Sequence, residues 1–103
     1  MANFVLVYHG GRMPDSAEEQ AQAMQAWGAW FGQLGAAVVD PGNPASQTHR
    51  IGADGSVSVD PGGPSGYSIL KADSIDQAVE LAKGCPVLLG GSTIQIVETF
   101  EAM

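Results

Sequence analysis

The chain has 103 residues, of which 45% are hydrophobic and only 15% are charged, a composition typical of one globular domain. Its formal net charge of -7 argues against roles on a nucleic-acid backbone or an anionic membrane surface, because both would repel it. We expect no leader peptide, and no apolar run reaches the ~20 residues of a membrane helix. The single Cys85 cannot form an internal disulfide and suits a reducing compartment, so we expect a cytoplasmic protein.

Hydrophobic spacing and the positions of Gly and Pro predict a strand–helix–strand order that occurs twice, with a hairpin between the copies. Ser16 and Glu19 have capping-box spacing at the start of the first helix, and Gly35 suits its end. Asp54-Gly55 predicts the hairpin turn because this pair readily takes positive φ. In chain order we expect a strand at 4–8, a helix from 16 to 35, a strand at 36–40, a hairpin of 48–51 and 57–59, a strand at 67–72, a helix from 74 to 84 and a strand at 93–98.

The first helix has an apolar stripe at helical spacing, which predicts the face that packs on the sheet. Trp30 falls at the margin of this stripe, where a tryptophan often touches a partner or a ligand. Gly28 and Gly32 lie inside the helix, and we expect close approach of the sheet or a partner to justify their cost. The stripe consists of Met24, Trp27, Phe31 and Leu34.

This order of elements, with right-handed crossovers, predicts an α+β fold: a ferredoxin-like βαββαβ sheet with an inserted β-hairpin and both helices on one face. Residues 4–8 are apolar on both faces of the first strand, and the helices cover only one of them. A second copy is the simplest cover for the other face. We therefore expect residues 1–103 to form one domain of a homodimer, with two sheets stacked as a dimeric α+β barrel.

Four short segments, spread over nearly the whole chain, carry a family resemblance. They are 4–8 with Gly10-Gly11, 27–31, 35–40 and 66–73. Together they resemble the YCII-related proteins, including their DGPF branch. The resemblance implies a dimeric ferredoxin-like barrel, with an acid–base Asp after the second strand and, in some members, a His on the first helix.

Asp40 matches the aspartate position of the family, but the chain departs from the pattern in two places. The Asp-Gly-Pro-Phe signature is reduced to Asp60-Pro-Gly-Gly-Pro64 and has no Phe. The helix position where the His would fall is Met24. A mechanism that depends on that His is therefore not carried over.

Three residues are candidates for acid–base catalysis: Asp40, His9 and His49. Asp40 ends an apolar strand, where partial desolvation would make its carboxylate a general base. The alternative, which we favour, is that it bonds the N–H groups of the following turn. His49 is expected to face solvent, whereas His9 ends a strand beside flexible glycines. The two histidines lack the spacing of a metal site, and we expect neither a metal nor a cofactor.

A small cleft is expected near the ends of the first two strands. Gly10, Gly11 and Arg12 could offer backbone N–H groups and a guanidinium to an anionic ligand, or could form a plain turn. Tyr8 and Trp30 complete this set of candidate ligand-binding residues. The loop at 60–66 is either a mobile lid or an irregular connection shaped by its prolines and glycines.

Three functions stay open at this point. The first is a small-ligand-binding module, and the second is an acid–base enzyme, an isomerase, lyase or hydrolase that uses Asp40 with a His. The third is a regulatory subunit that binds another protein through an apolar surface. An enzyme needs Asp40 and a histidine within hydrogen-bond reach, a binding module needs a lined pocket, and an interaction subunit needs a spare apolar patch.

Overall fold

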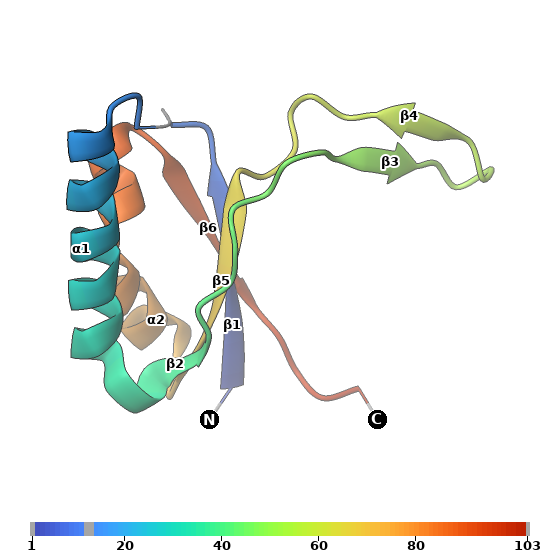
Figure 1. Cartoon of the computed structure of the whole chain (residues 1–103). Helices are drawn as coiled ribbons and strands as arrows, with labels where there is room; N and C mark the ends of the chain where they lie inside the picture. The colour runs from blue at the N-terminus through green and yellow to red at the C-terminus, as the bar shows by residue number, and fades with distance from the viewer. Residues whose placement is uncertain (1, 12–13, 103) are drawn as a thin grey trace.

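The computed structural model describes residues 2–11 and 14–102, and its elements follow the predicted order (Figure 1). They are β1 (Ala2–His9), α1 (Ala17–Leu34), a 3₁₀ turn (Gly35–Ala37), β2 (Val38–Asp40), β3 (His49–Ile51), β4 (Val57–Val59), β5 (Gly66–Ala72), α2 (Ile75–Ala82), a second 3₁₀ turn (Pro86–Gly90) and β6 (Thr93–Glu98). Four strands form an antiparallel sheet in the order β2-β5-β1-β6, and β3 pairs only with β4. The predicted ferredoxin-like α+β fold is confirmed.

Strand β1 lies at the centre of the sheet, and its side chains alternate between two different environments. Phe4, Leu6 and Tyr8 are buried on the face that α1 and α2 cover (Figure 1). Val5 and Val7 point to the opposite face and stay partly exposed. The strand register places Tyr67, Ile69 and Val97 beside them. We call this surface, made by Val5, Val7, Tyr67, Ile69 and Val97, the bare face, because none of the described elements covers it.

Helix α1 begins and ends where its capping residues predict. The Glu19 N–H donates to Ser16 Oγ at 3.1 Å, and Glu19 Oε2 accepts from the Asp15 N–H at 3.4 Å. Gly35 takes a positive φ of 56°, and its N–H donates to the Phe31 carbonyl. The cap prediction is therefore confirmed at both ends.

The buried face of α1 is rotated from the predicted stripe. Trp30, expected at the margin, is the buried residue of this helix at 4% exposure, whereas Met24, expected inside, is 76% exposed. The Trp30 indole N–H donates to the Leu81 carbonyl in the last turn of α2 at 3.1 Å, and this bond holds the ring inward. Trp27 and Phe31 pack against the core but are only partly buried. The prediction was wrong because the first helix is contacted from one side by the segment after α2 as well as by the sheet.

The two glycines inside α1 face open space and do not touch the sheet. A Cβ atom at Gly28 or at Gly32 would have no neighbour within 4 Å outside the helix. Within this chain, the expectation of close backbone approach is therefore wrong. We predict that Gly32→Ala raises the free energy of unfolding by about 0.5–1 kcal/mol, since alanine loses less backbone entropy. Chemical denaturation would measure this gain, and a loss of stability would show that something packs on the glycine.

Helix α2 is short and lies close to the sheet because small side chains face it. Ala78 and Ala82 are buried, and Ser74 caps the first turn by accepting the Gln77 N–H at 3.1 Å. Pro86 then opens the second 3₁₀ turn, which the sequence analysis did not predict. The first 3₁₀ turn likewise replaces the start of the predicted strand at 36–40, because the chain is still turning after Gly35.

The β3–β4 hairpin extends away from the body, on the side of the sheet opposite the helices (Figure 1). Its turn uses Gly55 at a φ of 87°, as the Asp-Gly signal predicts. The radius of gyration is 15.1 Å, against about 13 Å for a compact domain of this length. Within the described residues, no helix is long and apolar enough to cross a membrane.

Candidate functional site

The three candidate catalytic residues lie in different parts of the fold. Asp40 ends β2, His9 ends β1 at the bare face, and His49 begins β3 in the extended hairpin. The described hydrogen bonds connect none of the three with another. The pairing that an acid–base enzyme would require is therefore not present in this conformation.

Asp40 serves the turn that follows β2. Its Oδ1 accepts the Gly42 N–H at 2.8 Å, an arrangement in which an aspartate side chain replaces a backbone acceptor. Gly42 has a φ of 77° and packs tightly against the Tyr67 carbonyl of β5. The Pro41 carbonyl accepts from Ser68 Oγ at 2.7 Å, so β5 fixes the same turn.

We predict that Asp40→Asn leaves the free energy of unfolding unchanged within about 0.5 kcal/mol, because the amide oxygen can still accept the Gly42 N–H. Asp40→Ala should lose about 1 kcal/mol with that hydrogen bond. Urea denaturation of the three proteins at neutral pH measures both effects. A clear gain in stability for the Asn variant would contradict the turn role and indicate a carboxylate held in an unfavourable site.

His9 lies at the end of β1, where the glycines that follow are tightly arranged. Its Nε2 lies 3.2 Å from Gln95 Oε1 of β6. Gly10 and Gly11 both have positive φ, and a Cβ at Gly11 would collide with Ser92. Ser92 Oγ in turn donates to the Gly10 carbonyl at 3.1 Å. These contacts describe an ordered turn, and Arg12 lies outside the described residues, so an anion site here stays a prediction.

Tyr8 lies inside the core, with its hydroxyl group in a short hydrogen-bonded chain. The phenol donates to Ser68 Oγ at 2.7 Å, and Ser68 donates to Pro41, so β1, β5 and the β2 turn are joined. Burial raises the pKa of the Tyr8 phenol well above its ordinary value. Burial likewise raises the pKa of the neighbouring Cys85 thiol, which fits the expected inert cysteine. A ligand contact by Tyr8 stays a prediction.

The raised pKa of Tyr8 predicts a dependence of stability on alkaline pH. The fold favours the neutral phenol, so its contribution is complete below the unfolded pKa of about 10 and is lost as pH rises above it. We expect the free energy of unfolding of Tyr8→Phe to fall less steeply than that of the wild type above about pH 10. Urea denaturation across this range measures both slopes. If the free energies of unfolding of the two proteins fall in parallel with pH, the raised pKa of Tyr8 is contradicted. The slope that remains in Tyr8→Phe comes from other groups, such as Cys85.

Trp30 borders an open hollow of about 350 Å³ between α1 and the second 3₁₀ turn. Lys83, Leu88 and Leu89 also line it, and Leu89 is 87% exposed. The indole N–H already donates to Leu81, so Trp30 offers this hollow only ring surface. Its predicted role in ligand binding stays untested.

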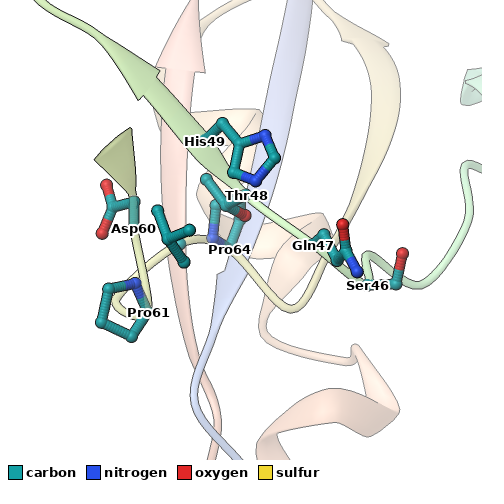
Figure 2. Close-up of a pocket in the computed structure, with 9 residues that line it drawn as sticks. Ser46, Gln47, Thr48, His49, Asp60, Pro61 and Pro64 are labelled. Atoms are coloured by element: carbon teal, nitrogen blue, oxygen red, sulfur yellow. The ribbon is translucent and has the colours of Figure 1, made fainter. Parts of the chain in front are cut away.

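A second hollow, of about 320 Å³, lies at the root of the hairpin and collects hydrogen-bonding side chains (Figure 2). One wall comes from the approach to β3 and the other from the loop that follows β4. Figure 2 shows the side chains of Ser46, Gln47, Thr48 and His49 along the first wall, and those of Pro61 and Pro64 on the second. We call this feature the root hollow; it is lined by Ser46, Gln47, Thr48, His49, Val59, Asp60, Pro61, Gly63 and Pro64.

Backbone hydrogen bonds fix the two walls of the root hollow. The Asp60 N–H donates to the Thr48 carbonyl at 2.8 Å, and a Cβ at Gly63 would collide with Thr48. The Ser65 N–H donates to the Tyr8 carbonyl at 2.7 Å, which attaches the loop to the end of β1. The root hollow therefore adjoins the strand end where the sequence analysis expects a cleft.

The Asp60 carboxylate in this hollow is already engaged. Its Oδ2 accepts from Arg50 at 2.8 Å, and its Oδ1 accepts the Gly62 N–H at 3.0 Å. The Arg50 hydrogen bond, followed by that from Gly62, lowers the pKa of Asp60. The Asp60 carboxylate therefore stabilises the loop as an anion, and its lowered pKa makes it a poor base. His49 is left as the exposed titratable group of the hollow that can exchange hydrogen bonds with a ligand.

Comparisons with known proteins support the fold. No protein-family model matches this chain, and no curated protein matches it. A solved structure does: 5-chloro-2-hydroxyhydroquinone dehydrochlorinase (TftG) from Burkholderia phenoliruptrix AC1100, in complex with 2,5-dihydroxybenzoquinone. The similarity covers 95% of this chain and 93% of that chain, with a TM-score of 0.52 and 20% sequence identity. The chain therefore shares its fold with TftG over essentially its whole length.

The root hollow is the feature that the sequence analysis missed. His49 was predicted as a candidate, and 60–66 as either a mobile lid or an irregular connection, but the two were not connected with each other. The hairpin signal at Asp54-Gly55 places residues before β3 opposite residues after β4, so that signal alone could have brought the two walls together.

Proposed function

We propose that this protein is a homodimeric domain of YCII type that binds a small organic molecule in the root hollow. The observation that carries the proposal is that Ser46, Gln47, Thr48 and His49 line one hollow together with Pro61 and Pro64. Five of its nine lining residues are polar and can fix the orientation of a ligand by hydrogen bonds, and its volume is at the lower end of the range for small-molecule sites.

The chemistry of the hollow favours a single-ring, oxygen-bearing ligand. The hydroxyl, amide and imidazole groups both donate and accept, so they suit phenolic or carbonyl oxygens. Val59, Pro61 and Pro64 offer apolar surface to a flat ring. The complex of the similarly folded TftG with 2,5-dihydroxybenzoquinone supports this class of ligand.

The homodimer is supported by the bare face. Valine and isoleucine side chains on an exposed sheet face lose contact with water only when another molecule covers them. We place this dimer in the cytosol, where the free thiol of Cys85 stays reduced.

Isothermal titration of the protein with 2,5-dihydroxybenzoquinone and a panel of hydroquinones tests the ligand site. We expect His49→Ala to weaken binding by about tenfold or more, the effect of losing a central contact. Ser58→Ala, an exposed change on β4 outside the hollow, is the matched control. If His9→Ala abolishes binding and His49→Ala does not, the site is on the bare face and the proposal fails. The proposal also fails if the wild type binds no member of the panel.

The name of TftG favours an acid–base enzyme as the second candidate function. This candidate would use Asp40 with a histidine, but Asp40 bonds Gly42 and His9 bonds Gln95. Catalysis by that pair would first require both hydrogen bonds to break. Loss of dehydrochlorinase activity in both Asp40→Asn and His9→Ala, after activity is found in the wild type, would support it over simple binding.

A further inference from the structure

The β3–β4 hairpin is amphipathic, although it extends into solvent. Cross-strand pairing sets Ile51 opposite Val57 and His49 opposite Val59, so these four side chains share one face of the hairpin. Arg50 and Ser58 form a pair on the other face. Three apolar side chains of the first face are largely exposed, namely Ile51 at 72%, Val57 at 65% and Val59 at 73%. We call these three residues the arm patch.

A two-stranded hairpin with an exposed apolar face is unfavourable when nothing packs against it. Two isolated strands are marginally stable in water, and β3 and β4 contact mainly each other. Polar residues at the three patch positions would serve an exposed hairpin better. The apolar choice therefore indicates that the arm patch is covered in the functional state.

The chain also exposes more surface than a monomer of its size requires. Its accessible surface is 7096 Å², whereas a compact protein of 10.6 kDa exposes about 5,500 Å². The excess is roughly 1,600 Å², about twice the ~800 Å² that each partner loses in a standard interface. An interface that involves both the arm and the bare face would be large enough for a stable dimer.

The arm and the bare face lie on the same side of the molecule, since the hairpin leaves the sheet opposite the helices (Figure 1). A body that rests on the bare face is therefore flanked by the arm. Two chains with a net charge of -7 repel each other, so a contact between them must rely on uncharged surface. The side chains that define the arm patch and the bare face carry no charge, although Asp40 pairs with Ile69 at the edge of the bare face.

We propose that the β3–β4 hairpin is a clasp that packs its arm patch on a second copy seated on the bare face. Under two-fold symmetry, the hairpin of each copy contacts the other copy in the same way. The inference rests on the homodimer of the proposed function and adds the surface that holds it. Because His49 and Val59 belong to both the hairpin face and the root hollow, the second copy would also close the open side of the ligand site.

Sedimentation equilibrium of the full chain tests the clasp. We expect a wild-type dimer at micromolar concentration and a dissociation constant raised about tenfold or more in Ile51→Lys/Val57→Lys, since charge would be buried against an apolar face. Ile51→Thr/Val57→Thr keeps β-branched side chains and should show a smaller rise with an intact circular dichroism spectrum. Ser58→Lys adds a charge to the opposite face of the hairpin and is the control; because Ser58 pairs with Arg50, its circular dichroism spectrum must also stay intact.

The outcomes separate the clasp from the proposed function. A wild-type dimer weakened by Val5→Lys but unaffected by both arm variants would overturn the clasp and leave the homodimer in place. A wild-type monomer would overturn both. Equal weakening by Ser58→Lys and the arm variants would also contradict the clasp, because the effect would not depend on the apolar face. Titration with 2,5-dihydroxybenzoquinone reports on the ligand site independently of these results.

Discussion

Trp30→Ala is expected to lower the free energy of unfolding by about 3–5 kcal/mol, the range for removing a buried aromatic ring. Trp30 is only 4% exposed. Its ring centroid lies 5.7 Å from that of Trp27 and 5.1 Å from that of Phe31. The indole N–H also donates to the Leu81 carbonyl at 3.1 Å, so the substitution removes a hydrogen bond between α1 and the last turn of α2. Chemical denaturation monitored by circular dichroism measures the loss.

Trp27→Ala is the matched control, because it removes the same side chain three residues earlier in the same helix. Trp27 is partly exposed and touches Tyr8 and Phe31 edge-on or tilted, each at 5.6 Å between ring centroids. We expect a clearly smaller loss of stability than for Trp30→Ala. Trp30→Phe keeps most of the ring surface and isolates the hydrogen bond to Leu81. If Trp27→Ala costs more than Trp30→Ala, the buried face assigned to α1 is wrong.

Gly42→Ala is expected to be the second strongly destabilising change, at about 2–6 kcal/mol. Gly42 has a φ of 77°, which an L-residue adopts only with strain. An added Cβ would also overlap the backbone carbonyl of Tyr67 in β5, and a backbone atom of a central strand cannot easily move away. The turn would then lose the hydrogen bond from Gly42 to Asp40.

Gly91→Ala separates the two causes. Gly91 has a similar φ of 85°, but an added Cβ there has no neighbour within 4 Å. We expect only the conformational cost, about 1–2 kcal/mol. Thermal and urea denaturation of both variants gives the comparison. Equal losses at the two positions would show that the approach of Gly42 to Tyr67 is looser than described.

Much of the fold was predictable because its signals are local. Ser16 and Gly35 mark the ends of α1, and Asp54-Gly55 marks the hairpin turn. The burial of Trp30 in place of Met24 was not predictable in the same way. Helical spacing identifies an apolar stripe, but the rotation of the helix about its axis depends on the elements that pack against it. Here the Leu81 carbonyl, 51 positions later in the chain, contributes to that rotation.

The candidate site was less predictable than the fold. The position of Asp40 at a strand end predicted that it bonds the following turn, and the hydrogen bond from Gly42 agrees with that interpretation. The root hollow was not predicted, since Thr48 and Asp60 become neighbours only when the hairpin closes. The arm patch was not predicted either, because short strands with exposed valine and isoleucine resemble ordinary buried strands in sequence.

A two-dimensional NMR titration of the isotope-labelled protein with 2,5-dihydroxybenzoquinone tests most directly whether the root hollow binds a small molecule. We predict concentration-dependent shifts of the backbone amides that line the hollow, namely those of 46–49, Val59, Asp60 and Gly63. We also predict that His49→Ala removes these shifts and that Ser58→Ala leaves them. Shifts confined to His9, Tyr67 and Gln95 on the uncovered side of the sheet, or no saturable shifts at all, would contradict the account.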